Sequence, residues 1–471
     1  MSTQPFIKAK DYHIFGFKGG RYIFNSEDVQ VKRATPLEEI ILTAVKNGCR
    51  SEQELLQRSG THDPVTIHGS VQGLLDQGFL NNDKFPVRDR KPNKAPYYTF
   101  MVNVAQKCNL SCKYCYTHQG SFDYRKKPEE AMSVQTGLQL VNFIFDQFRS
   151  AEKITFHFYG GEPLLNFECI KAIVEVSEKK ASESQTVTDF AVTTNGTRIG
   201  PTIAEFFNEH GFTVFLSIDG PESVHDQFRL HRDGHGSFLE VRKNFELLKN
   251  LPNIFIIGSS VIRRDWSLAD AISFLTALGV HQYKAERVWL PEDSHINLTA
   301  MEKKQYQQDI RALYDHYLDA IKQFRKPLDY RLNSKLLQLL QGVKRTHFCQ
   351  AGDQTFGISA SGELYPCSLH VGRSQAYLGD LTNGFDLERV KAFQEAYCVD
   401  NAAECRSCWA RYLCGGGCSA MVDRFGRNDC EFIRAETETA IAIYQTIMDT
   451  DPILLLNLVA PSYAKWAIGE S

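Results

Sequence analysis

The chain has 471 residues, enough for two or three domains, and its 43% hydrophobic and 23% charged content is that of an ordinary globular protein. Its net charge of −3 gives no bulk attraction to nucleic acid or to an anionic membrane. Residues 1–20 lack the apolar core of a signal peptide, and no apolar run approaches the roughly 20 residues of a membrane helix. We therefore expect a cytoplasmic protein that binds neither nucleic acid nor membrane.

Residues 1–85 are predicted to form a small module. Its expected elements are strands at 12–17 and 21–24, joined through Gly19-Gly20, and three short helices that open at Pro36, Ser51 and Thr66. This order indicates a winged-helix-like arrangement. Residues 86–97, which are charged and contain Pro86, Pro92 and Pro96, are typical of a linker.

Residues 98–325 alternate short apolar runs with helical stretches. We expect strands at 99–105, 153–158, 188–193, 213–218, 254–261 and 282–288, and helices at 133–149, 167–180, 201–210, 237–249, 268–278 and 301–325. Repeated βα units predict an α/β fold in which a parallel sheet curls into a partial (β/α)6 TIM-type barrel. In such barrels the chemistry lies at the carboxyl ends of the strands.

Residues 326–435 are rich in cysteines and turns, so we expect few regular elements there and a fold organised around metal. Helical periodicity returns in residues 436–471, which we expect to form a C-terminal helical tail.

Thirteen cysteines are unusual for a chain in a reducing compartment, where disulfides are rare and metal binding gains weight. They are also clustered, with three between residues 108 and 115 and eight between residues 349 and 430. Cys49 and Cys169 stand apart and are most simply explained as small buried apolar residues.

The first cluster, Cys108, Cys112 and Cys115, follows the first predicted barrel strand. A cubane iron–sulfur cluster normally takes four cysteine ligands, so three leave one iron free to hold a small molecule. The alternative is a structural zinc site, for which His118 offers a fourth ligand.

The spacing Cys108-x3-Cys112-x2-Cys115, with Tyr114 before the last cysteine, resembles the signature of the radical S-adenosylmethionine (SAM) superfamily. The resemblance implies that the free iron chelates the amino and carboxylate groups of SAM. It also implies that an electron from the reduced cluster cleaves the sulfonium and releases a 5′-deoxyadenosyl radical. The three cysteines would then be both metal ligands and catalytic residues.

Further motifs match the same superfamily at successive strand ends. The resemblance implies cofactor-binding roles for Tyr114, Gly160, Gly161, Glu162, Thr194, Asn195, Ser217, Asp219 and Arg229. Glu162 would accept from the ammonium of SAM, whereas a serine and an arginine suit its ribose and carboxylate. Each motif taken alone is equally explained by a turn or a helix cap, and Arg232 and Arg242 are alternatives to Arg229.

The later cysteines resemble the SPASM extension of this superfamily, which carries two auxiliary [4Fe–4S] clusters and would bring the total to three. The family pattern assigns Cys405, Cys408, Cys414 and Cys430 to a distal cluster, and Cys349, Cys367 and Cys418 to a proximal one. Some members have an additional cysteine shortly after the first, but Gln350 to Gly357 contains none. The proximal cluster would therefore keep an open iron for a substrate thiolate.

Two alternatives remain for this segment. Cys398 is a candidate for the missing ligand, although its position after a helical stretch favours a buried structural thiol. A pair of zinc sites would fit the ligand counts almost as well.

The N-terminal module resembles the PqqD-like peptide-recognition domain of maturases that act on ribosomally made peptides. Residues 1–90 hold twelve basic and eleven acidic residues, a net of +1, and so lack the basic face of a DNA-binding domain. The resemblance implies that a leader peptide adds a strand to the sheet, and Tyr22 to Phe24 is our candidate edge strand. The alternative is a purely structural appendage.

Together the three parts resemble sactipeptide and ranthipeptide maturases. They predict an oxidoreductase that joins a cysteine sulfur to a carbon of a precursor peptide, with flavodoxin or ferredoxin as the electron donor. The alternatives are a carbon–carbon or carbon–oxygen cross-linking maturase, a sulfatase-maturing enzyme that generates formylglycine, and a metal-bound scaffold that binds a peptide.

Overall fold

The computed structural model describes residues 12–59, 63–81, 97–115, 131–323 and 329–459. His118, our candidate zinc ligand, lies outside these ranges, as does most of the predicted linker. Across the described ranges, no helix is long and apolar enough to cross a membrane.

The N-terminal module is an antiparallel three-stranded sheet followed by three helices. Its elements are β1 (Tyr12–Phe17), β2 (Gly20–Asn25), β3 (Gln30–Arg33), α1 (Pro36–Lys46), α2 (Glu52–Ser59) and α3 (Pro64–Asp76). The strand order is β1-β2-β3, so our candidate edge strand, Tyr22 to Phe24, is wrong because it lies in the central strand. The sequence pattern missed β3, whose four residues are mostly charged or polar and half-buried.

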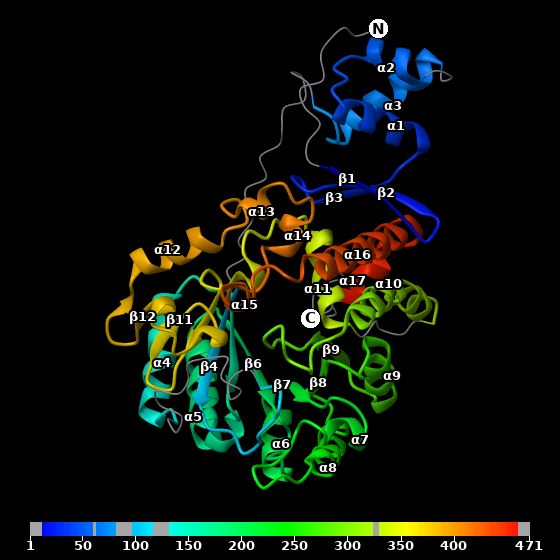
Figure 1. The fold of residues 1–471 in the computed structure, drawn as a ribbon. Coiled ribbons are helices and arrows are strands. Elements are labelled where there is room, and N and C mark those ends of the chain that lie inside the picture. The colour runs from blue at the N-terminus through cyan, green and yellow to red at the C-terminus, as the bar shows by residue number, and fades with distance from the viewer. Residues whose placement is uncertain (1–11, 60–62, 82–96, 116–130, 324–328, 460–471) are drawn as a thin grey trace.

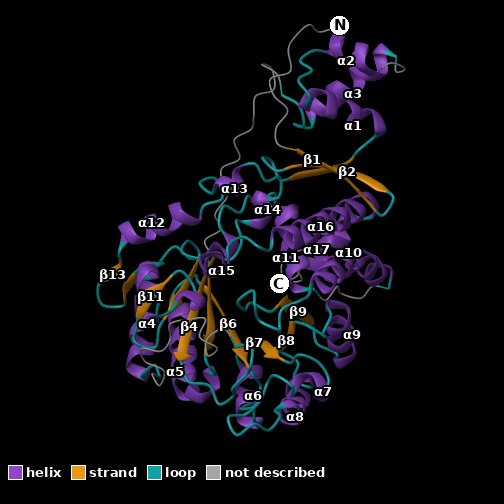
Figure 2. Ribbon diagram, viewed as in Figure 1, coloured by secondary structure: helices purple, strands orange, loops and turns teal. Residues whose placement is uncertain are grey.

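The six predicted barrel strands are present and parallel. They are β4 (Tyr97–Ala105), β5 (Lys153–Gly160), β6 (Val187–Thr194), β7 (Thr213–Ser217), β8 (Phe255–Ile262) and β9 (Gln282–Arg287). The helices between them are α4 (Val134–Gln147), α5 (Phe167–Ser182), α6 (Pro201–Glu209), α7 (Glu222–His225), α8 (Phe238–Lys249) and α9 (Leu268–Leu278). Figures 1 and 2 show these helices on one face of the curved sheet.

Alternation along the strands explains this layering. Ile154, Phe156 and Phe158 of β5 are fully buried in the main core, which also contains residues of α4 and α5. The residues between them, such as His157, point to the opposite, inner face of the sheet because successive side chains alternate. His157 stacks on Phe215 of β7, with ring centroids 5.0 Å apart, and its Nε2 lies 2.8 Å from Thr193 Oγ1.

The sheet continues past the barrel into the cysteine-rich segment, where we expected few regular elements. β10 (Thr355–Ile358) pairs in parallel with β4, and β11 (Glu363–Tyr365), β12 (Gly379–Asp380) and β13 (Gly384–Phe385) follow in antiparallel order. The result is one ten-stranded sheet, β13-β12-β11-β10-β4-β5-β6-β7-β8-β9. Residues 355–385 thus share the sheet of the barrel.

The rest of the cysteine-rich segment is short helices and turns. Its helices are α12 (Leu387–Tyr397), α13 (Ala403–Arg406), α14 (Arg411–Cys414) and α15 (Ser419–Phe425). Two of them include predicted metal ligands: α13 contains Cys405, and α14 ends at Cys414.

A helical group joins the module to the barrel. It consists of α10 (Ala300–Lys322), α11 (Tyr330–Gln341), α16 (Cys430–Thr450) and α17 (Pro452–Val459). α16 begins at Cys430, earlier than the predicted tail, and contacts all three strands of the N-terminal sheet. Phe15, Phe17 and Phe24 of that sheet share one buried core with residues of α10, α11 and α16, so the sheet is part of the main body (Figure 1).

Candidate active site and cysteine groups

The cysteine loop lies at the carboxyl end of β4, as predicted. The amide N–H groups of Ser111 and Lys113 donate to the carbonyls of Leu230 and Phe228, at 2.7 and 3.0 Å, which fixes the loop against the segment after α7. Cys108 Sγ accepts from the Leu110 amide at 3.4 Å and from Asn195 Nδ2 at 3.7 Å. Such donors stabilise a thiolate and tune a cluster bound to it.

Burial disfavours the ionised form of the Cys108 and Cys112 thiols. It raises the pKa of Cys108 to about 12 and that of Cys112 to about 11. A bound metal reverses this cost because its charge compensates the thiolates. The loop is therefore suited to hold cations through Cys108, Cys112 and Cys115.

Two glycines bring the end of β5 into contact with this loop. A Cβ on Gly160, whose φ is +129°, would lie 2.1 Å from the Ala105 carbonyl oxygen, and one on Gly161 would lie 2.4 Å from that of Gln106. The amides of Gly161 and Glu162 donate to the Ala105 and Lys107 carbonyls at 2.8 and 3.0 Å. These glycines thus allow close backbone packing beneath the cysteine loop.

Glu162 is fully buried and joins three strand ends. Its carboxylate accepts from the Thr194 hydroxyl and the Asn195 amide, both at 2.8 Å, and from the Leu164 amide at 3.1 Å. These hydrogen bonds lower the pKa of Glu162, but burial raises it by more, to about 7. Asn195 in turn donates to Asn109 Oδ1 at 3.0 Å, so Glu162 and Asn195 link the loop to β6.

Asp219 is the centre of a second buried network. Its carboxylate accepts from the Tyr114 hydroxyl at 2.5 Å, from Arg229 Nε at 3.1 Å and from Arg263 Nη1 at 3.3 Å. Burial alone would raise the pKa of Asp219, but Arg229 and Arg263 lower it, so the carboxylate stays ionised. Ser217 lies two residues earlier, at the end of β7.

The structure separates the three candidate arginines. Arg229 lies in the Asp219 network, and its charge lowers the pKa of Cys112 against the larger effect of burial. Arg232 donates to the Cys108 carbonyl at 3.2 Å, whereas Arg242 forms an ion pair with Glu246 along α8. Arg229 is thus the one of the three that reaches Asp219.

Sequence reasoning missed Arg263, which follows β8 and is 1% exposed. Its guanidinium lies 4.1 Å from the centroid of the Phe228 ring and donates to the Val224 carbonyl at 2.8 Å. The one signal in the sequence was its place directly after a predicted strand.

The later cysteines form two groups. Burial and the neighbouring thiols of Cys349 and Cys418 raise the pKa of Cys367, and Cys349 also raises that of Cys418. Burial and the thiols of Cys414, Cys408 and Cys430 raise the pKa of Cys405. We refer to the two predicted sets as the proximal group (Cys349, Cys367 and Cys418) and the distal group (Cys405, Cys408, Cys414 and Cys430).

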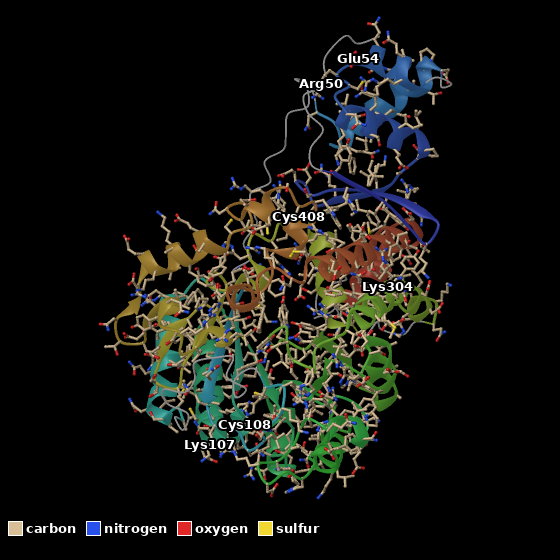
Figure 3. All side chains as sticks on the ribbon, in the orientation of Figure 1. Arg50, Glu54, Lys107, Cys108, Lys304 and Cys408 are labelled. Carbon is tan, nitrogen blue, oxygen red and sulfur yellow. The ribbon has the colours of Figure 1, made fainter. Side chains whose placement is uncertain are left out.

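Gly415 and Arg434 lie beside the distal group. Gly415, beside the distal group, allows the chain to approach the backbone of His347 and Phe348, since a Cβ there would lie 2.7 Å from both. Arg434 hydrogen-bonds to Cys408, which raises the pKa of the guanidinium. Figure 3 labels Cys408 below the N-terminal sheet and Cys108 lower in the same view.

The spacing of the ligands bears on the metal. In the described part of the chain, no three His, Cys, Asp or Glu side chains are gathered closely enough to hold a single metal ion. A [4Fe–4S] cluster needs a wider arrangement because each cysteine binds a different iron.

Cys398 belongs to neither set. It follows the last residue of α12, and its amide donates to the Gln394 carbonyl at 3.0 Å. Cys349 is exposed, although the surrounding protein raises the pKa of its thiol. Of the three proximal cysteines, Cys349 is exposed and Cys367 is buried.

The fold and the cysteine loop can now be compared with known proteins. Residues 102–263, about a third of the chain, match the model of the Radical SAM superfamily. This segment contains the cysteine loop, the Glu162 and Asp219 networks and Arg263.

Curated relatives extend the comparison. The chain is 32% identical over 162 residues to a "Serine-type anaerobic sulfatase-maturating enzyme" of Bacteroides thetaiotaomicron, a match that covers 34% of this chain and 38% of that relative. It is 25% identical over 339 residues to a "Cysteine-type anaerobic sulfatase-maturating enzyme" of Clostridium novyi, covering 67% and 86%. The solved structure of anSMEcpe with bound AdoMet and a Cp18Cys peptide has the same fold, with a TM-score of 0.61 at 20% identity over 75% of this chain and 99% of that one.

Proposed function

We propose that this chain is a radical SAM maturase that forms thioether cross-links in a ribosomally made precursor peptide. A cysteine sulfur of the peptide would be joined to one of its carbons. The observation that carries the proposal is the proximal group, which has three thiols and the accessible Cys349. With Cys398 apart from it, a cluster there keeps an iron that a substrate thiolate can bind.

The residues near the first cysteine loop would bind SAM. Cys108, Cys112 and Cys115 would hold the first cluster, which supplies the radical chemistry when SAM is bound. Arg229, already ionised beside Asp219, is suited to a carboxylate, and Tyr114 offers a ring held in place by its bond to Asp219. Glu162 and Asn195 would fix the loop and the strand ends around the cofactor.

The distal group and the N-terminal sheet complete the proposal. Each of the three cysteine sets would hold one cluster: a donor such as flavodoxin or ferredoxin would supply the reducing electron, and the two auxiliary clusters would take up the surplus electron. β1 and β3 are the outer strands, and in the described part of the chain neither pairs with a further strand on its outer side. A leader peptide would therefore add to β1 or β3 as an extra strand.

The test is co-expression with a cysteine-containing precursor, followed by mass spectrometry. We expect the peptide to lose two hydrogens and its cysteine to resist alkylation. Cys112→Ala should abolish both this modification and SAM cleavage because it removes a ligand of the first cluster. Cys398→Ala, outside all three sets, is the matched control and should retain both. SAM cleavage at the wild-type rate in Cys112→Ala would refute the first-cluster assignment.

The second candidate function is sulfatase maturation, which the names of the curated relatives favour. It predicts an aldehyde at the target residue, detectable with a hydrazide probe. A free, alkylatable cysteine with two hydrogens lost elsewhere would indicate a carbon–carbon or carbon–oxygen cross-link instead. The proximal group favours the thioether because it offers the substrate sulfur a binding site.

A further inference from the structure

One carboxylate on the inner face of the barrel stands near the end of the last barrel strand, β9. Glu286 is near the carboxyl end of β9, where Tyr283 and Ala285 are buried on the outer face, so Lys284 and Glu286 point inward. The Glu286 side chain is 46% exposed, and Lys284 Nζ lies 3.4 Å from its Oε2. Glu286 is thus held by one cation while much of its carboxylate stays accessible.

The end of β9 is fixed against the cysteine-rich segment on two sides. Arg287 forms an ion pair with Asp429, the residue before Cys430. Trp289 packs in the same apolar cluster as Cys418 and Leu369. Leu369 lies two positions after Cys367 in the sequence. Glu286 also raises the pKa of Cys349 and of Cys418, and Lys284 lowers that of Cys349, in both cases beside the larger effect of burial.

We propose that Glu286 is the fourth, displaceable protein ligand of the proximal cluster. This inference rests on the proposed function, in which a substrate thiolate binds the same iron. A carboxylate is a hard ligand, whereas iron–sulfur clusters favour soft thiolates, so a substrate sulfur would replace it. In the exchange the iron–carboxylate bond breaks, an iron–thiolate bond forms, and the proton of the thiol passes to solvent; nothing is oxidised or reduced.

Lys284 gives the displaced carboxylate a partner. Its Nζ already lies 3.4 Å from Glu286 Oε2. Once released from iron, the carboxylate therefore remains paired rather than isolated. This lowers the cost of the exchange and keeps the open iron shielded from other ligands between turnovers.

The test uses the full chain, reconstituted anaerobically and saturated with SAM so that the first cluster is closed to other ligands. 2-Mercaptoethanol is titrated in while the auxiliary clusters are followed by Mössbauer and electron paramagnetic resonance spectroscopy. Glu286→Gln should change the spectrum of the proximal cluster before any thiol is added. If the carboxylate occupies the iron nine-tenths of the time, Glu286→Gln should also bind the thiol about tenfold more tightly.

Two further variants make the result decisive. Glu286→Cys should give an all-cysteine cluster whose spectrum no longer responds to thiol. Glu292→Gln, six residues along the chain on an exposed site, should behave as the wild type. If Glu286→Gln and Glu286→Cys both match the wild type, the assignment of Glu286 is wrong. If Glu286→Gln alters the spectrum but no variant binds thiol, Glu286 stands as a ligand and the thioether proposal loses its support.

Discussion

At the scale of single residues, the site depends on buried charges that neutralise one another. Asp219 is fully buried between Arg229 and Arg263, and Tyr114 donates to it. Removing one member of such a network leaves the others with uncompensated charge, which costs far more than an exposed pair. The cysteine loop is thereby tied to β7 and β8 through Tyr114.

Arg263→Leu should therefore destabilise the fold by about 3 kcal/mol, because Asp219 loses a buried partner. The control is Arg242→Leu, whose partner Glu246 is 45% exposed, and which should cost less than about 0.5 kcal/mol. Urea unfolding followed by circular dichroism measures both. Equal midpoint shifts for the two variants would show that the Asp219 network contributes no more than a surface pair.

The sequence identified most of this site but not its charge balance. Cys108, Cys112, Cys115, Glu162 and Asp219 stood out because their motifs have fixed local spacing. Arg263 has no such motif, and its role follows from a contact between β7 and β8 that only the fold creates. Glu286 has no motif either, since several carboxylates lie in or after predicted strands and only the fold shows that it points to the inner face of the barrel.

At the scale of elements, close packing between strand ends determines where the cysteine loop lies. Gly161 has no space for a side chain, because a Cβ would meet the Gln106 and Lys107 carbonyl oxygens at 2.4 and 2.5 Å. Any substituent there must push the loop after β4 away from β5. The cysteines would then lose the arrangement that a cluster needs.

We accordingly expect Gly161→Ala to lower the iron bound at the first loop and to abolish SAM binding. Gly200→Ala is the control, because a Cβ at this helix start, whose φ is −115°, meets nothing within 4 Å. Iron analysis and equilibrium SAM binding distinguish the two variants. Normal iron content and SAM affinity in Gly161→Ala would mean that the loop does not depend on this contact.

Local sequence patterns predicted the barrel elements well because each has a strong period of its own. The six strands and the helices α4, α5, α6, α8 and α9 lie within a few residues of their expected ranges. The failures are the pairing of β10 with β4, which are distant in sequence, and the central position of β2. Which strand is an edge depends on β3, whose short polar sequence gave no strand signal.

At the scale of the whole molecule, the N-terminal sheet is joined to the segment that carries the distal group. Glu27 forms ion pairs with Arg411, between Cys408 and Cys414, and with Lys344 at 3.4 Å. His13 stacks on Trp409, with ring centroids 3.8 Å apart, and its Nε2 lies 3.0 Å from Glu438 of α16. The module is therefore in direct contact with the segment that carries the distal group.

Glu27→Ala should lower the thermal unfolding midpoint and the iron content of the distal group, because Arg411 and Lys344 would remain largely buried without this partner, at about 1–3 kcal/mol. Glu39→Ala removes a more exposed pair with Arg21 in the same module and is the matched control. Differential scanning calorimetry and iron analysis on both variants test this. A distal group that is fully loaded and equally stable in Glu27→Ala would show that the module is an independent attachment.

The parallel pairing of β4 with β10 also determines when the molecule can be completed during synthesis. Thr99 of β4 pairs with Thr355 of β10. One edge of β4 therefore lacks its neighbouring strand until most of the polypeptide has left the ribosome. An unprotected strand edge invites pairing with other nascent chains, and long-range closure is slow. Slower translation and a lower growth temperature should therefore raise the yield of properly folded protein more than added iron does.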